Sequence, residues 1–213
     1  MTTDDLIAQL SGTVAPVSRR AVGERLARGL LLGAIVSAAV MAAGLGLRPD
    51  LGAAIHGSIF WMKAAYTMSL AALALTATRQ LARPDAGSIR WLWLATLPVL
   101  LLAVVGVADL SGAPSSAWLA LWLGKSWRIC PWLILALSVP VFLGLLWSFR
   151  SLAPTRLRAT GATAGLASGA FAATIYCLHC PEASAMFVLT WYSLGILLAT
   201  AIGALLGPRL LRW

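Results

Sequence analysis

Charged residues are scarce in this chain, and acidic residues are the scarcest of them. Only 11% of the 213 residues are charged, and seven Asp or Glu stand against sixteen Lys or Arg. A soluble domain of this length needs more polar surface to cover its core. With 60% hydrophobic residues and a mean hydropathy of +0.87, the composition therefore predicts a membrane protein.

A cleavable signal peptide is also missing from the expected organisation. The first apolar run begins near Leu26, after a polar tail, and it is long enough to span a bilayer rather than be removed. The net charge of +9 could suggest nucleic acid, but the basic residues form short clusters between apolar runs instead of one basic face. Direct nucleic-acid binding is therefore not expected.

Six stretches are long and apolar enough to be transmembrane helices, which need about 20 mostly apolar residues. They are residues 27–46, 56–77, 91–108, 130–149, 161–179 and 187–206. We therefore expect an all-α membrane protein with six transmembrane helices. Its parts would be an N-terminal tail at 1–25, a transmembrane domain at 26–207 and a C-terminal tail at 208–213.

The distribution of arginine predicts the orientation. Arginines cluster in both tails and in the loops after the second and fourth spans, whereas the other loops carry only Arg48, Lys125 and Arg128. Because cytoplasmic loops carry the excess of Lys and Arg, both termini are expected in the cytoplasm. The tryptophan-rich segment 117–129 is then expected along the outer interface.

Small residues four positions apart recur within the spans. Glycine pairs or triplets of this spacing predict helices that pack closely; they are Gly29 and Gly33; Gly161, Gly165 and Gly169; and Gly203 and Gly207.

Cysteine is rare as well, with three in the chain. In the predicted topology Cys130, Cys177 and Cys180 all lie at the outer ends of the fourth and fifth spans, on the oxidising side, where thiols tend to pair. Cys130 and Cys180 are expected to be neighbours. Cys177 and Cys180 also have the C-x-x-C spacing of redox centres, although Cys177 is equally explained as a small apolar residue that fills space.

His179 and Glu182 lie beside these cysteines and add ligand types for zinc or a softer metal. A metal site would require the helix to unwind there, which Pro181 permits. A metal ion is considered as a signal, and no resident cofactor is expected.

Lys63 is a charged residue inside the second span. It lies about 10 Å deep at 1.5 Å per residue, where a charge needs a partner or a water-filled cavity. Glu182 or Asp109 is the expected counter-ion, and His56 is expected on the same helix face. The alternative is that Lys63 extends to the outer interface along Trp61.

The N-terminal tail contains a short amphipathic segment, TTDDLIAQL. Asp4 and Asp5 suit a helix start, and Leu6, Ile7 and Leu10 follow on one side. The segment is too short to be stable alone in water. Docking on a partner protein, lying on the bilayer and remaining disordered are all open.

Four stretches together resemble the NrsF-type anti-sigma factors, the negative regulators of sigma F of proteobacteria. They are TDDLIAQL, FWMKAAYTMSLA, SWRICPWLILALSVPVFLGLLWSFRSLAPTR and YCLHCPEASAMFVLTWYSLGILLATAIGALLGPRLLRW. The resemblance implies a non-enzymatic, six-helix inner-membrane protein that sequesters an extracytoplasmic-function sigma factor and releases it under oxidative or heavy-metal stress.

The resemblance also implies roles for particular residues. Cys130 in WRICP and Cys180 in LHCPE correspond to the family's paired sensing cysteines, whereas Cys177 falls outside the pattern. The N-terminal tail is the expected sigma-factor docking segment, through Asp4, Asp5, Leu6, Ile7 and Leu10, together with the cytoplasmic loops.

Three other functions are compatible with the residues alone. A thiol oxidoreductase coupled to quinone generally needs two cysteine pairs, and this chain has three cysteines. A metal or proton transporter using Lys63, His56 and Glu182 would usually need a carboxylate in the middle of a span. The third alternative is a scaffold. The oligomeric state is not predicted.

Overall fold

A computed structural model describes residues 2–12, 20–84, 86–150 and 152–212 of the chain. It is 79% helical, and the described residues contain no strand. The expectation of an all-α fold is therefore confirmed.

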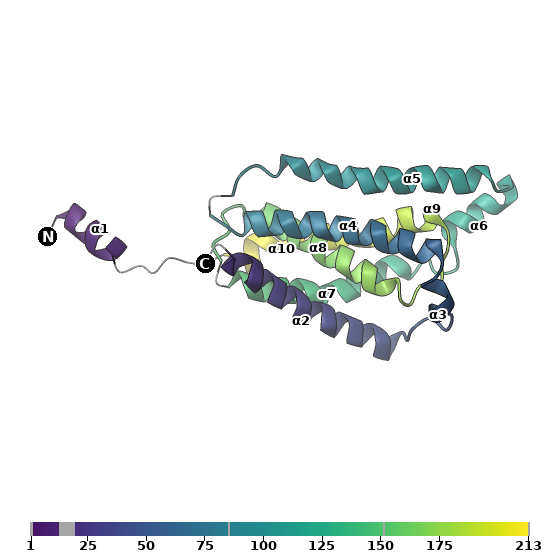
Figure 1. Cartoon of the computed structure of the whole chain (residues 1–213), viewed down its shortest axis with the longest axis horizontal. Helices are drawn as coiled ribbons and strands as arrows, with labels where there is room; N and C mark the ends of the chain where they lie inside the picture. The colour runs from purple at the N-terminus through teal and green to yellow at the C-terminus, as the bar shows by residue number, and fades with distance from the viewer. Residues whose placement is uncertain (1, 13–19, 85, 151, 213) are drawn as a thin grey trace.

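The described residues form six long helices. These helices lie side by side along the longest axis of the molecule (Figure 1). Short elements connect or precede them: α1 (Thr3–Gly12), α3 (Leu51–Ala54), the 3-10 turn η2 (Ser115–Ala117) and α6 (Trp118–Leu123). The long helices are α2 (Ala21–Gly44), α4 (Ser58–Leu81), α5 (Thr96–Ser111), α7 (Cys130–Phe149), α8 (Leu157–Tyr176) and α10 (Ser193–Leu210). The turn η1 (Arg90–Ala95) leads directly into α5. The short helix α9 (Ala185–Phe187) and the turn η3 (Val188–Tyr192) lead directly into α10.

Five of these helical stretches are long and apolar enough to cross a membrane: α2, α4, η1–α5, α7 and α9–α10. The sixth long helix, α8, is not among them, because it is long enough but not apolar enough. Its sequence LRATGATAGLASGAFAATIY consists largely of small residues, and most of them are buried against α10, α4 and α7. A helix enclosed by other helices needs small residues for close approach rather than large apolar ones for lipid contact.

The glycines predicted to pack helices do so. A Cβ on Gly29 would collide with the carbonyl oxygen of Gly144 on α7, and one on Gly161 would collide with the carbonyl oxygen of Gly203 on α10. A Cβ on Gly165 would likewise collide with the backbone carbonyl oxygen of Ala199 on α10. The α2–α7 and α8–α10 pairs therefore touch backbone to backbone, and this confirms the packing predicted from the four-residue spacing.

The predicted start of the second span, at residue 56, was wrong. The helix begins at Ser58, because Gly57 adopts an extended backbone with ψ of 143°. His56 therefore lies outside α4, exposed in the preceding turn, and does not share a helix face with Lys63. The predicted span 130–149 coincides with α7, and the segment before it forms the separate short helix α6.

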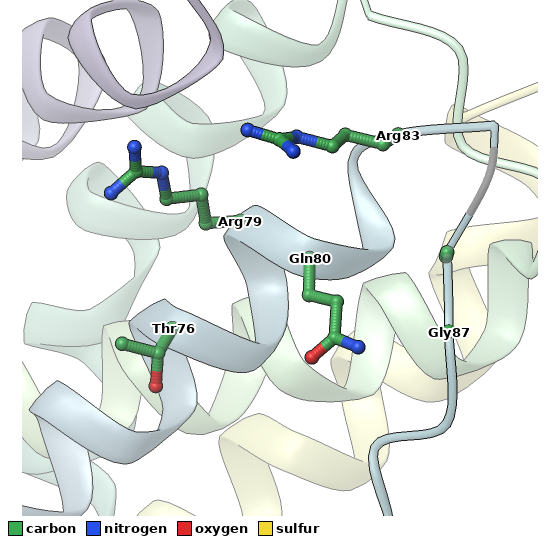
Figure 2. A pocket seen from close by; sticks show the side chains of 6 residues that line it. Thr76, Arg79, Gln80, Arg83 and Gly87 are labelled. Atoms are coloured by element: carbon green, nitrogen blue, oxygen red, sulfur yellow. The ribbon is translucent and has the colours of Figure 1, made fainter. Parts of the chain in front are cut away.

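Two hollows lie along α4. One, of about 360 Å³, is at its C-terminal end and is lined by Thr76, Arg79, Gln80, Arg83, Ala86 and Gly87 (Figure 2). The other, of about 380 Å³, separates α4 from α5 and has an almost wholly apolar lining. Only Leu102 and Gly106 of α5 are buried, so this helix packs loosely on the bundle and leaves the groove between α4 and α5 open.

Candidate functional site

The three cysteines come together at the end of the bundle opposite the two chain termini (Figure 1). Cys130 is the first residue of α7, Cys177 follows the last residue of α8, and Cys180 lies in the segment that joins α8 to α9. All three are free thiols, buried to 1% exposure or less, and belong to one hydrophobic cluster. Cys130 and Cys180 therefore belong to the same buried cluster, as expected, while their use as a sensing pair stays a prediction.

Two buried tyrosines line this thiol cluster. Tyr176, at the end of α8, neighbours both Cys130 and Cys180. Tyr192 neighbours Cys177 and Cys180, and its hydroxyl is the one buried side-chain polar atom without a hydrogen-bond partner among the described residues. Tyr192 lies on η3, a π-helical turn, and such turns re-aim side chains within helices and are frequent at functional sites.

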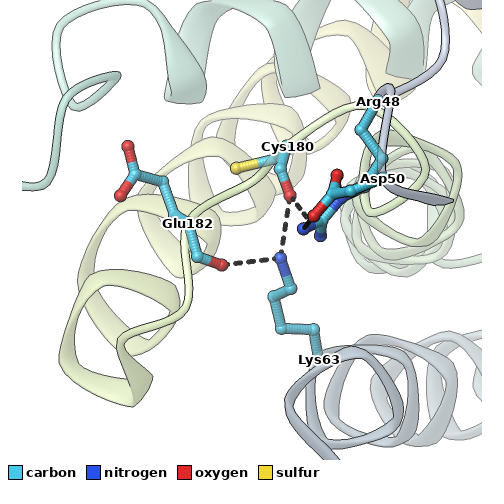
Figure 3. Close-up of polar contacts among 5 residues, drawn as sticks. All are labelled: Arg48, Asp50, Lys63, Cys180 and Glu182. Carbon is cyan, nitrogen blue, oxygen red and sulfur yellow. Dashed lines mark hydrogen bonds and ion pairs between the residues drawn. The ribbon is translucent and has the colours of Figure 1, made fainter. Parts of the chain in front are cut away.

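The backbone around Cys180 is held by Lys63. The Lys63 ammonium nitrogen donates to the carbonyl oxygen of Glu182 at 2.8 Å and to that of Cys180 at 3.0 Å (Figure 3). Lys63 is fully buried, so its charge is satisfied by these two backbone dipoles and does not extend to the interface. Lys63 thereby ties the N-terminal part of α4 to the cysteine segment.

Lys63 has a partner, as expected, but not the one expected. The prediction that it pairs with a carboxylate was wrong: the backbone carbonyl oxygen of Glu182 accepts a hydrogen bond from Lys63, and Asp109 is exposed elsewhere. The Glu182 carboxylate instead accepts from the backbone N–H of Lys125 at 2.7 Å and from Ser126 N–H at 3.1 Å. It joins the cysteine segment to the start of α7.

The loop between α2 and α3 supplies a third support. The Arg48 N–H donates to the Leu178 carbonyl at 3.1 Å, and its guanidinium donates to the Cys180 carbonyl at 3.4 Å. The same guanidinium pairs with Asp50 at 2.7 Å and lowers the pKa of that carboxyl. The His179 ring donates through Nδ1 to the Gly46 carbonyl at 2.9 Å, since a carbonyl oxygen only accepts.

A metal centre receives no support from this arrangement. The chain does unwind at Cys177–Cys180, as a metal site would require. However, the side chains of His179 and Glu182 turn to Gly46 and to the start of α7 respectively. Within the part of the chain that the structure describes, no three His, Cys, Asp or Glu side chains are grouped closely enough to hold an ion.

The N-terminal segment forms the helix α1 predicted from its pattern. Thr2 and Asp5 cap it reciprocally: the Thr2 N–H donates to the Asp5 carboxylate at 2.9 Å, and the Asp5 N–H donates to the Thr2 hydroxyl at 3.3 Å. These bonds lower the pKa of Asp5. Asp4, Leu6, Ile7 and Leu10 are exposed on this helix.

Sequence reasoning missed Arg48, Tyr176 and Tyr192. The only available signals were a lone arginine in the loop after the first span and tyrosines spaced by one and twelve positions from the C-x-x-C pair. The packing of Trp122, Trp127 and Trp191 on one another, at the cysteine end of the bundle, was also missed. The Trp191 indole N–H donates to the Trp122 carbonyl at 2.9 Å, and its ring lies 5.2 Å from that of Trp127.

Comparisons with known proteins agree on one family. The family model described as "Negative regulator of sigma F" matches residues 10–213. A "Probable anti-sigma-F factor NrsF" of Azospira oryzae is 42% identical over 214 residues, and an "Anti-sigma-F factor NrsF" of Caulobacter vibrioides is 41% identical over 215 residues; both alignments cover the whole of each chain. No solved structure matches.

Proposed function

This chain belongs to the family of negative regulators of sigma F, and from this premise we propose that it is a membrane-embedded anti-sigma factor. It binds an extracytoplasmic-function sigma factor at the cytoplasmic face of the inner membrane and keeps it from the transcription machinery. Six helices, α8 included, cross the bilayer, and both termini are cytoplasmic. The role is regulatory, without catalysis.

The observation that carries this proposal is the separation of two unlike features at opposite ends of the bundle. The buried cysteines lie at one end, and both chain termini lie at the other (Figure 1). The exposed apolar residues Leu6, Ile7 and Leu10 on α1 suit a protein partner, and Asp4 and Asp5 disfavour the anionic leaflet. Helix α8 runs between the two ends at the centre of the bundle.

Sensing is assigned to Cys130 and Cys180. Hydrogen peroxide takes two electrons from the two thiols; the S–H bonds and the O–O bond break, one S–S bond forms, and two molecules of water leave. Alternatively, a thiophilic heavy-metal ion displaces the two thiol protons and bridges the sulfurs. Cys177 acts only as a small buried residue, donating to the Ala173 carbonyl at 3.3 Å.

Either event would change the position of the Cys180 segment relative to the start of α7. That segment follows α8 directly, and its carbonyls accept from Lys63 on α4 and from Arg48. A disulfide requires Cβ atoms about 3.8 Å apart, so a shift at this end has to be accommodated by α8 or by these hydrogen bonds. The contact between the Cys180 segment and the start of α7 would thus have two states, one reduced and one oxidised or metal-bound. Switching between these states carries the signal to the sigma-binding end.

Binding of the sigma factor is the first part to test. Full-length protein and a form lacking residues 1–24 would be solubilised in detergent and used to capture purified sigma F. The account expects capture by the full chain and its loss on truncation. A finer variant, L6S with I7S, removes two exposed apolar side chains of α1 and is expected to weaken capture in the same way.

The matched control is L47S with I55S, which removes two exposed apolar residues at the cysteine end. Capture by this control should equal that of the unmodified chain. Capture that survives truncation would move the docking site to the cytoplasmic loops. If neither form captures sigma F, the anti-sigma function is contradicted.

A further inference from the structure

The backbone and the side chain of Glu182 have different partners. Its carbonyl oxygen accepts from Lys63 at 2.8 Å, whereas its carboxylate turns away from Lys63 (Figure 3). One carboxylate oxygen, Oε1, accepts from the Lys125 N–H at 2.7 Å, the Ser126 N–H at 3.1 Å and the Ser126 hydroxyl at 3.2 Å. Successive backbone N–H groups bind an anionic oxygen well, and hydrogen bonds to a charged acceptor are the strong ones. The side chain is therefore firmly attached to this loop.

The loop that receives the carboxylate has a backbone suited to it. Gly124, directly before Lys125, has a φ of 57° and a ψ of −164°, a conformation that residues with a side chain rarely adopt. A Cβ at Gly124 would lie 2.6 Å from Oε2 of Glu182 and 2.7 Å from the ring of Phe187. Glycine at this position therefore permits the turn and also leaves the space that the carboxylate occupies.

The same loop is bonded to the first thiol residue, Cys130. The Ser126 carbonyl oxygen accepts from the Cys130 N–H at 2.9 Å, so Ser126 is bonded to Glu182 on one side and to Cys130 on the other. Between Glu182 and the second thiol residue, Cys180, lies only Pro181, whose ring restricts the backbone. A short chain of hydrogen bonds and stiff backbone therefore connects the two thiol residues.

The two thiols otherwise belong to separate elements. Cys130 begins α7, and Cys180 lies in the segment between α8 and α9. Two groups react with one another more readily when they are already held close, because less conformational entropy is lost when the bond forms. A side chain that joins these two elements therefore favours a bond between the thiols.

From this network we propose that Glu182 is a positioning residue for the thiol pair: its carboxylate holds the Cys180 segment against the loop before α7 and so sets the stability of the Cys130–Cys180 disulfide. This role rests on the sensing function proposed above for the two cysteines and extends it. A firmer attachment lets the pair be oxidised by a weaker oxidant, so Glu182 sets the redox threshold of the sensor.

The test is the thiol–disulfide equilibrium of the full-length, detergent-purified protein in mixtures of reduced and oxidised glutathione, approached from both sides. The two thiols pass two electrons to oxidised glutathione; one S–S bond forms, the glutathione S–S bond breaks, and two glutathione thiols take up the two protons. Mass spectrometry of alkylated peptides gives the oxidised fraction. In E182M, the value of [GSH]²/[GSSG] at half oxidation should fall by at least about tenfold, because the bonds to a charged acceptor are lost.

Two further variants separate positioning from a loss of stability. E182Q keeps a carbonyl oxygen that can accept the same bonds and should recover part of the fall. G124A displaces the carboxylate from the opposite side, so it should lower the value in the otherwise unmodified chain but add little in E182M. A residue with a purely structural role would lower the unfolding temperature of the reduced protein without moving this equilibrium.

D109M is the matched control, since it removes an exposed carboxylate near the end of α5 at the cysteine end of the bundle (Figure 1). It should behave as the unmodified chain does. An unchanged or raised value in E182M, an equal fall in D109M, or no recovery in E182Q would overturn the role of Glu182 while leaving the sensing pair intact. If the unmodified chain forms no Cys130–Cys180 disulfide in any mixture, the sensing pair itself is wrong, and the role of Glu182 is overturned with it.

Discussion

The Lys63 ammonium nitrogen lies 3.0 Å from the Cys180 carbonyl oxygen and 2.8 Å from the Glu182 carbonyl oxygen. One buried cation in the second long helix thus fixes the backbone on both sides of Pro181. Segments separated by more than a hundred positions in the sequence are joined directly at the thiol cluster.

Replacing Lys63 with Met should loosen the cysteine segment while keeping most of the side-chain volume. It removes the donor to the Glu182 carbonyl oxygen and leaves the Cys180 carbonyl oxygen only the 3.4 Å bond from Arg48. Each unsatisfied acceptor costs about 1–3 kcal/mol. We expect a lower unfolding temperature in detergent and faster labelling of Cys180 by a maleimide. K125M removes an exposed lysine at the same end and should change neither. Unchanged labelling in K63M would contradict the role given to Lys63.

The cysteines should be slow to react in the resting state, because all three are buried to 1% exposure or less. Maleimide labelling of the native protein is expected to be slower by orders of magnitude than labelling in denaturant, where every thiol is accessible. Mass spectrometry of labelled peptides would give the rate at each site. Rapid labelling of Cys130 and Cys180 in the native protein would show that this end is open.

Two glycines provide a test of helix packing with opposite expected signs. G161A should destabilise the bundle, since its Cβ would collide with the Gly203 carbonyl and push α8 from α10. G44A should be tolerated or stabilise slightly, by up to about 1 kcal/mol, because nothing lies within 4 Å of a Cβ there and alanine favours helix. The measurement is the unfolding temperature of each variant in comparison with that of the unmodified chain. Equal effects would contradict the close α8–α10 contact.

The Arg48–Asp50 pair gives a pH dependence with a defined sign. Its hydrogen bond to Arg48 lowers the pKa of Asp50 below the ordinary value of 3.8. The pair therefore contributes stability above pH 3.8, and the contribution is lost as the pH falls through the lowered pKa. The difference in unfolding temperature between the native chain and D50N should be constant from pH 5 to 8 and shrink below pH 4. A difference that grows on acidification would have the wrong sign.

Much of the fold follows from the sequence, and the exceptions have physical causes. The bounds of α7 were predictable because Cys130–Pro131 and Arg150 enclose a mostly apolar run that contains no charged residue. His56 was misplaced because apolar length does not reveal that Gly57 is extended. The partner of Lys63 was not predictable, because carbonyls of Cys180 and Glu182 become available only when the chain leaves its helix after Tyr176. Tyr192 is aimed by a π-helical turn that leaves no composition signal.

C177S separates the sensing pair from the third cysteine. We expect C177S to retain sigma F when reduced and to release it on oxidation, as proposed for the unmodified chain. The side chain contributes one hydrogen bond to Ala173 and little volume, so its replacement should leave the thiol pair intact. Capture of sigma F before and after oxidant treatment gives the answer. Loss of release in C177S would make Cys177 a member of the sensing group.

The most direct measurement is the affinity of purified sigma F for the full-length protein in nanodiscs, reduced and after treatment with hydrogen peroxide, alongside C130S with C180S. We expect tight binding by the reduced protein and at least about tenfold weaker binding after oxidation, which is about 1.4 kcal/mol. We also expect a Cys130–Cys180 disulfide in the oxidised sample and no peroxide effect in the double variant. Equal affinity in both redox states, with the disulfide formed, would contradict the central claim.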